Sequence, residues 1–347
     1  MKSNGGRAAM NMRTVAKYAG VSTATVSRVL NGSAAVKPET AEHVKRILHK
    51  LKFIPNPIAT TLKYGRSNTY GVIVPDLTNP FYPEFLLNFE EALLENDQEL
   101  LLATTQSSDR KLIGSVRRML MRHVDGVVLM ASEYDTRLIE PLFDHKIPIV
   151  TVDRGAAREG AGDVAIDFVD GYKQIMVHLY ELGHRHIGFV GGMMGIRTSE
   201  ARLDAFQAAL QHVGITYNHD FIRCGDYRVA GGEAAARSLL KSPRRPTAIL
   251  TVNDLTAFGV LRALHSSGLS VPSQISVAGF DGIMLSEAVH PSLTTVAIST
   301  RNMVGACLKV LEYVKANINK RGLLVPVRGS LIVRESTGPA ATVQRQR

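Results

Sequence analysis

The chain has 347 residues, 45% of them hydrophobic, which is enough for a well-packed core and more than one domain usually holds. Its 41 basic and 31 acidic residues give a net charge of +10. No run of about 18 apolar residues occurs and the N-terminus has no apolar signal segment, so we expect neither a membrane span nor export.

The excess positive charge lies at the N-terminal end. Residues 1–68 contain 12 Lys or Arg and two acids, Glu39 and Glu42, so they carry the whole net charge and the remainder is neutral. This distribution is typical of a polyanion-binding domain on a neutral body. A basic disordered tail is the alternative, and we expect one only over residues 1–11.

Residues 12–30 predict two short helices joined by a tight turn at Gly20, where glycine accepts a positive φ without steric cost. Ser22 is placed to cap the second helix. Apolar side chains at helical spacing form the buried faces: Val15, Ala16, Ala19, Val21, Val26 and Val29. The pattern is typical of a helix-turn-helix DNA-binding domain, and a third helix is predicted after Pro38.

From residue 70 onward, short apolar runs alternate with helical segments. The predicted strands are 71–75, 99–103, 126–130, 148–152, 164–166, 187–190, 248–251 and 276–280. Helices are predicted between them, at 85–96, 112–122, 171–182, 199–213, 230–241 and 254–267. Two such series predict an α/β body of two doubly wound lobes, with a small molecule bound in the cleft at the carboxyl ends of the strands.

Eight side chains near predicted strand ends are candidates for this ligand site: Phe81, Tyr82, Asp153, Thr198, Arg202, Tyr227, Asn253 and Asp281. Aromatic rings stack on sugars or bases, and a guanidinium fork opposite a carboxylate suits a polyol. Two alternatives to a ligand role stay open. Phe81 and Tyr82 could instead pack inside a lobe. Separately, Arg202 and Asp281 could form a purely structural ion pair.

Enzyme activity and cofactors are not predicted, because no phosphate-binding glycine loop, nucleophile elbow or metal motif occurs. His184 and His186 lack a third ligand, so we expect ordinary surface histidines. Cys224 and Cys307 have no metal-like spacing, which favours a reduced cytoplasmic location. An exported solute-binding receptor is the alternative class, but it would not carry a basic helix-turn-helix.

Short motifs follow one another along nearly the whole chain: Val26–Gly32, Ile54–Leu62, Val74–Phe81, Val124–Val127, Gly183–Gly188, Thr251–Asp254, Gly279–Asp281, Leu293–Val296 and Val333–Thr337. Each is weak alone, but the ordered set resembles the lactose-repressor (LacI/GalR) family of transcriptional regulators. Gly282 departs from the family pattern, which often has a second aspartate there.

The resemblance implies an all-α helix-turn-helix domain and a periplasmic-binding-protein-like body with three crossovers, near residues 166, 299 and 325. The expected domains are a disordered tail (1–11), the DNA-binding domain (12–55), a hinge helix and linker (56–69), an N-terminal lobe (70–166 plus 299–325), a C-terminal lobe (167–298 plus 326–337) and a tail (338–347).

The resemblance also implies roles in DNA binding. The helix from Ser22 to Leu30 enters the major groove, with Thr23 and Ala24 at base edges. Arg28 is expected to contact guanine, because its fork matches O6 and N7; a solvated surface arginine is the alternative. Phosphate-positioning groups are expected at Thr14, Ser22, Thr25, Ser27 and Asn31.

Residues 56–63 are the second expected DNA-binding element. Asn56-Pro57 suits a helix start, and Ala59 and Leu62 share one helical face. By resemblance this helix pairs with its twin in a homodimer, and Leu62 wedges between central base pairs from the minor groove. Too short to be stable alone, the helix is expected to form only on DNA.

The resemblance therefore implies a cytoplasmic, nucleoid-associated dimeric repressor that binds a near-palindromic operator. A ligand would act by changing lobe closure, as inducer or corepressor. We expect a sugar or sugar derivative as the ligand, with a nucleobase or nucleoside as the alternative.

We expect Leu62→Ala to weaken operator binding by about tenfold or more, because the variant loses the side chain that wedges the base step. Effector binding should be unchanged. A titration of parent and variant on one operator tests this, and equal affinities would contradict the wedge.

Overall fold

The computed structural model describes residues 11–30, 35–53, 66–130, 134–155, 157–242 and 244–341. The chain divides into two compact units, one ending before Asn68 and one from Asn68 onward. Within the described ranges, no helix is both long and apolar enough to cross a membrane.

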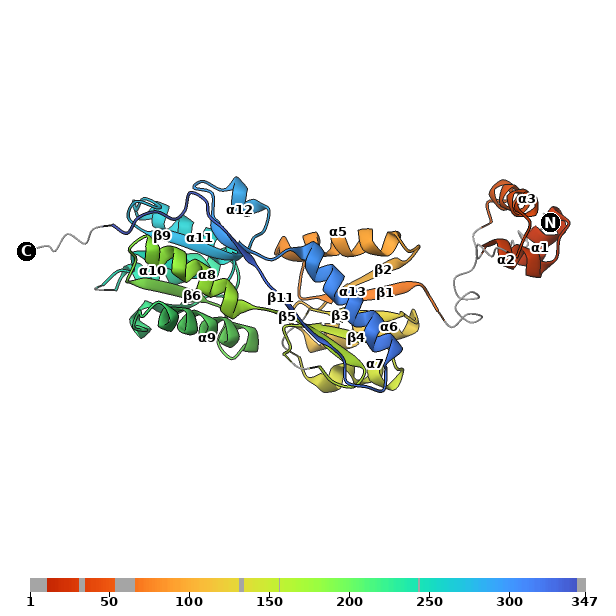
Figure 1. Ribbon diagram of the computed structural model, residues 1–347, viewed down its shortest axis with the longest axis horizontal. Helices are drawn as coiled ribbons and strands as arrows, with labels where there is room; N and C mark the ends of the chain where they lie inside the picture. Colours follow the sequence, from red (N-terminus) through yellow and green to blue (C-terminus); the bar gives the residue numbers. More distant parts are fainter. Residues whose placement is uncertain are drawn as a thin grey trace, which may run out of the picture. The chain divides into compact units, whose positions relative to one another are not determined.

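The described part of the first unit consists of helices α1 (Met12–Ala19), α2 (Thr23–Leu30) and α3 (Pro38–Lys50) (Figure 1). Its buried core is Val15, Ala16, Ala19, Val26, Val29 and Val44. This confirms the predicted apolar faces, with Val21 partly buried beside them.

Local hydrogen bonds set the ends of these helices. Asn11 Oδ1 accepts from the backbone N–H of Thr14 at 3.0 Å and begins α1, while Ser22 Oγ accepts from the N–H of Thr25 at 3.0 Å and begins α2. Gly20 has φ 64° and ends α1 in the left-handed conformation. The predicted turn and cap are therefore present.

The second unit contains two sheets, each of six strands within the described residues. The first-lobe sheet has the order β11-β5-β4-β3-β1-β2: β1 (Thr69–Val74), β2 (Glu99–Thr104), β3 (Gly126–Leu129), β4 (Ile149–Val152), β5 (Ala161–Ile166) and β11 (Leu324–Val327). The second-lobe sheet has the order β12-β10-β9-β8-β6-β7: β6 (Ile187–Gly191), β7 (Ile222–Cys224), β8 (Ala248–Thr251), β9 (Ser276–Asp281), β10 (Thr294–Ala297) and β12 (Ser330–Ile332).

All neighbouring strands are parallel except β10 and β12, which are antiparallel. The expected α/β body of two wound lobes is confirmed. In both sheets the strand order reverses beside the first strand, at β1 and at β6, which is where ligands of such sheets bind.

Helices cover both faces of each sheet. In the first lobe, α5 (Phe81–Leu94) and α13 (Thr300–Ala316) pack on one face, while α6 (Asp109–Met121), the 3₁₀ helix Thr136–Ile139 and α7 (Glu140–Asp144) pack on the other. In the second lobe, α8 (Phe168–Glu181) and α9 (Arg197–His212) pack on one face and α10 (Val229–Leu240) and α11 (Asp254–Ser266) on the other. The 3₁₀ helix His219–Phe221 and α12 (Leu285–Ala288) complete this lobe.

The chain passes between the lobes three times: from β5 to α8, from β10 to α13, and from β11 to β12. Figure 1 shows α13 and β11, late in the sequence, lying on the first lobe beside β5. β11 continues to Val327, two residues beyond the crossover expected near 325.

The strand pattern missed β7, β10, β11 and β12. These strands have three or four residues each, and Pro326 inside β11 lacks a backbone donor, so the short apolar runs Leu323–Val325 and Leu331–Val333 are not predicted as strands. Their pairing partners decide their conformation instead.

The surface position expected for His184 is wrong. Its ring is 1% exposed and its nitrogens make hydrogen bonds with Thr247 Oγ1 at 2.9 Å, Ser276 Oγ at 3.1 Å and the carbonyl of Gly338 at 3.0 Å. His184 therefore ties the C-terminal segment to the second sheet. His186 is exposed, as expected.

We expect Gly232→Ala to destabilise the body by about 1–3 kcal/mol, because a Cβ there would lie 2.2 Å from the carbonyl oxygen of Thr256 on the neighbouring helix. The matched control is Gly305→Ala in α13, where a Cβ meets nothing within 4 Å. The control should gain up to about 1 kcal/mol, because alanine is the better helix former. Thermal melting of both variants tests the contact, and a stabilised Gly232→Ala protein would contradict it.

Candidate functional site

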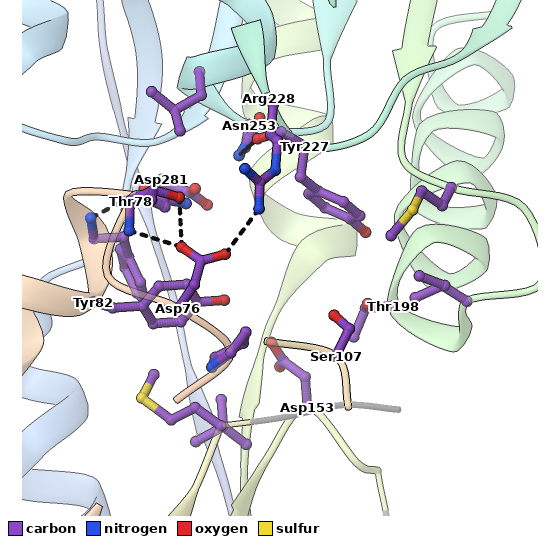
Figure 2. A pocket seen from close by; sticks show the side chains of 18 of the residues that line it. Asp76, Thr78, Tyr82, Ser107, Asp153, Thr198, Tyr227, Arg228, Asn253 and Asp281 are labelled. Carbon is purple, nitrogen blue, oxygen red and sulfur yellow. Dashed lines mark hydrogen bonds and ion pairs between the residues drawn. The ribbon is translucent and has the colours of Figure 1, made fainter. Parts of the chain in front are cut away.

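A cavity of about 360 Å³ lies between the two lobes, at the carboxyl ends of both sheets. Figure 2 shows side chains converging on it from both lobes. All eight side chains predicted from the sequence line this cavity: Phe81, Tyr82, Asp153, Thr198, Arg202, Tyr227, Asn253 and Asp281.

Arg202 on α9 is the buried cation of the cavity, with 8% of its surface exposed. Its guanidinium carbon lies 4.3 Å from the ring centre of Phe168 and 5.0 Å from that of Phe280, so the charge is in contact with two aromatic rings. Nη1 donates to the carbonyl of Val252, and Nη2 lies 3.5 Å from Asp281 Oδ1. Among the described residues, Arg202 Nε is the one buried side-chain nitrogen or oxygen without a hydrogen-bond partner.

Asp281 ends β9 and has φ 107°, a strained conformation for a residue with a side chain. Burial raises the pKa of its carboxyl to about 6, although the charge of Arg202 and a hydrogen bond from the Asn79 side chain lower it. The structural ion pair left open by the sequence is thus present, and it lines the cavity.

Asp153 follows β4 and has φ 56°. Burial raises the pKa of its carboxyl to about 7, although its Oδ1 accepts from the backbone N–H of Ile166 at 2.7 Å. The two strained aspartates, Asp153 in the first lobe and Asp281 in the second, therefore bring acceptors to the cavity from both sheets.

Asn253 shapes the site from the start of α11. Its Oδ1 accepts from the N–H of Thr256 at 3.0 Å, and its Nδ2 donates to the carbonyl of Tyr227 at 3.1 Å. Tyr227, which has φ 65°, shares a 2.8 Å hydrogen bond between its hydroxyl and Ser199 Oγ. Asn253 thereby fixes the Tyr227 loop against the helix end.

The rings of Phe81 and Tyr82 pack edge to face, 5.9 Å between centres. Phe81 is 7% exposed and belongs to the hydrophobic core. Tyr82 is partly buried against that core, and burial raises the pKa of its hydroxyl. Lobe packing and cavity lining, posed as alternatives, therefore occur together.

Sequence reasoning missed several polar residues of the cavity: Asp76, Thr78, Asn79, Ser107, Asp226 and Arg228. Asp76 accepts from the N–H and the hydroxyl of Thr78, at 2.7 and 2.6 Å, and pairs with Arg228 at 3.3 Å. Burial tends to raise the pKa of Asp76, but these partners outweigh it and lower the pKa. The sequence offered one signal for Asp76, which is its place shortly after the end of a strand. Asp76 follows β1 as Asp153 follows β4.

The exposed face of α2 is the candidate DNA-binding surface. Thr23, Ala24 and Arg28 are exposed, and Thr25 is half-buried. Thr14 is half-buried, and its hydroxyl donates to Asn11 at 3.1 Å. Ser22 is exposed.

Ser27, expected from the sequence to position phosphate on the outward face of α2, does not lie on that face, because only 6% of its surface is exposed. On a helix of 3.6 residues per turn, Ser27 lies about 60° from the half-buried Leu30, so the buried arc extends beyond the valines to include it. The other predicted DNA-binding residues lie outside the described ranges: Asn31, Asn56, Ala59 and Leu62.

Two family models match the chain. Residues 11–56 match "Bacterial regulatory proteins, lacI family", and residues 176–337 match "Periplasmic binding protein-like domain". The HTH-type transcriptional repressor PurR of Actinobacillus pleuropneumoniae serotype 3 is 31% identical over 300 residues, which cover 86% of this chain and 89% of that protein. The chain belongs to the lacI family of bacterial regulatory proteins.

Solved structures agree with this family. The lac repressor dimer bound to operator and the anti-inducer ONPF is 26% identical with a TM-score of 0.82, covering 95% of this chain and 99% of that chain. The CelR-cellobiose complex is 30% identical with a TM-score of 0.71, covering 94% and 99%. This lacI-family chain is thus a ligand-responsive, DNA-binding transcriptional regulator, and its relatives are regulators rather than enzymes.

Stability of the body should fall as pH rises from about 4 to about 7. The folded-state pKa of Asp153, about 7, lies above the ordinary value of 3.8, so the folded state binds this proton more tightly than the unfolded state. Ionisation then costs at most about 1.4 kcal/mol per pH unit in this window.

The Asp153→Asn variant should lose its share of this pH dependence, and asparagine also tolerates a positive φ. Melting temperatures of parent and variant between pH 4 and 8 test the effect. The melting temperature of the variant relative to the parent should rise with pH, and a constant difference would contradict the buried carboxyl.

Proposed function

We propose that this regulator is a repressor whose affinity for its operator is set by a neutral sugar or sugar derivative bound in the interlobe cavity. One observation carries the proposal: the guanidinium of Arg202 lines the same cavity as the carboxyls of Asp153 and Asp281. A polyol has hydroxyls that both donate and accept, so it satisfies both kinds of group at once.

The charges around the cavity favour an uncharged ligand. Four carboxyls line it, those of Asp76, Asp153, Asp226 and Asp281, against the two guanidinium groups of Arg202 and Arg228. Both guanidinium groups already have carboxylate partners. A phosphorylated or carboxylated ligand would add negative charge where negative charge is already in excess.

On the DNA side, we propose that α2 enters the major groove, with Arg28 contacting guanine and Thr23 and Ala24 at base edges. Phosphates would be held by four of the groups expected from the sequence: Thr14, Ser22, Thr25 and Asn31. The proposed unit is a homodimer on a near-palindromic operator in the cytoplasm, with Leu62 of the hinge at the centre. The similar lac repressor is a dimer on its operator.

A purine ligand is the second candidate, since the chain is 31% identical to a repressor named PurR and three aromatic side chains line the cavity: Phe81, Tyr82 and Tyr227. Phe81 is used largely in packing, however, which leaves fewer faces for stacking.

Arg202→Gln should lower the affinity for the sugar at least about tenfold, because a buried hydrogen-bonding charge is lost. Operator affinity without sugar should stay within about twofold of the parent, and it should fall steeply as salt rises. Asp281→Asn, a smaller change in the same ion pair, should also lower the affinity for the sugar. Arg262→Gln on the surface of α11 is the matched control.

The measurements are thermal-shift and operator titrations with cellobiose, ribose, lactose, adenine and guanine. A purine that binds while every sugar fails would replace the sugar by the second candidate. Absence of operator binding at low salt would overturn the regulatory proposal itself.

A further inference from the structure

Two arginines of the second lobe reach the first lobe at the edge of the interlobe cavity. Arg228, just before α10, pairs with Asp76 after β1, 3.3 Å between Nη2 and Oδ2. Arg197, the first residue of α9, lies against Gly155 after β4. Figure 2 shows the Asp76–Arg228 pair as a dashed line between the two side chains.

Both ends of the Asp76–Arg228 pair are held by their own loops. Asp76 Oδ1 accepts from the N–H and the hydroxyl of Thr78, which leaves Oδ2 for Arg228. On the other side, Asp226 Oδ1 accepts from the N–H groups of Arg228 and Gly231, at 2.9 and 3.1 Å. The two charged groups are therefore preorganised toward each other, which lowers the entropy lost on pairing.

The second contact is a close approach of Arg197 to a glycine. Gly155 has φ +73°, and a Cβ there would lie 2.6 Å from Arg197 Nη2. Its N–H donates to Asp163 Oδ2 at 2.8 Å, so the first-lobe backbone is fixed where Arg197 meets it. A side chain at residue 155 would displace the arginine.

We propose that these four residues, Asp76, Arg228, Gly155 and Arg197, form an interlobe clasp that stabilises the closed separation of the lobes. The clasp rests on the proposed function in one respect, because the cavity whose closure it sets is the proposed effector site. Both contacts join residues of different lobes, so each is lost when the lobes separate. The clasp therefore adds to the stability of the closed state relative to the open one.

The strength of the clasp follows from its exposure. The side chain of Arg228 is 61% exposed and that of Asp76 is 24% exposed, so solvent and salt screen their attraction. Breaking it should raise the open population about two- to fivefold, rather than abolish closure. The hydrogen bond between Asn79 and Asp281, also between the lobes, remains in such a variant.

The test measures lobe separation by paired spin labels. Cys224 in the second lobe is exposed and Cys307 is buried, so one added cysteine, Arg110→Cys on α6 of the first lobe, completes a labelled pair. Labelled chains are mixed with excess unlabelled protein, so that a dimer carries one labelled copy. No DNA and no effector is needed, so failure of the clasp is distinguishable from failure of the proposed function.

Arg228→Gln, Asp76→Asn and Arg197→Gln should each shift the distance distribution toward the open separation. The exchanged pair Asp76→Arg with Arg228→Asp should return toward the parent distribution, because it restores opposite charges. Arg237→Gln, which removes an equal charge paired with Glu233 inside the second lobe, should leave the distribution unchanged.

High salt should shift the parent distribution toward the open form and leave Arg228→Gln less affected. The proposal is overturned if the single variants keep the parent distribution, or if the exchanged pair is as open as the singles.

Discussion

Three crossings of the chain between the lobes are the constraint on which the site depends. They bring the carboxyl ends of two parallel sheets to the same cavity, so the residues that follow β1, β4, β6, β8 and β9 face one another. Because α13 and β11 return to the first lobe late in the sequence, neither lobe is a continuous stretch of chain. Movement of one lobe against the other therefore acts on three connections at once.

The buried charges of the second lobe differ in how well they are satisfied. Asp254 accepts hydrogen bonds from the N–H of Ile283 and the hydroxyls of Ser286 and Thr295, at 2.9, 2.7 and 2.6 Å. It joins α11 to the segments after β9, and its environment explains its burial. Arg202 is 8% exposed, donates to the carbonyl of Val252 and pairs with Asp281, while its buried Nε has no hydrogen-bond partner. Asp254 is thus accounted for by contacts within its own lobe, whereas Arg202 also lines the cavity between the lobes.

The sequence predicts the cavity well because its residues are placed by topology. Asp153, Asn253 and Asp281 lie just after strands or at their ends, and parallel strands bring such positions to one edge whatever the details of packing. The helix-turn-helix is predictable for a similar reason, since helical periodicity alone identifies Val15, Val26 and Val29 as buried.

What the sequence does not predict depends on neighbours that are distant along the chain. His184 is buried by Ser276 and Gly338, and Arg228 meets Asp76 across 152 residues and a gap between lobes. The burial of Ser27 is missed because helical periodicity identifies the centre of the buried face of a helix better than the edge of that face. These contacts follow from the assembled fold, whereas strand ends follow from the order of elements.

A ligand controls such a molecule only if it prefers one lobe separation to another. The cavity provides that preference geometrically, because Asp153 and Tyr82 come from the first lobe while Arg202 and Asp281 come from the second. A ligand that contacts both sets makes its full complement of hydrogen bonds at one separation alone. The contribution of any interlobe contact of the protein then adds to the ligand's, so the closed population depends on their sum. Contacts between the lobes and contacts to the ligand are for this reason parts of a single equilibrium, and residues that never touch the ligand can set its affinity.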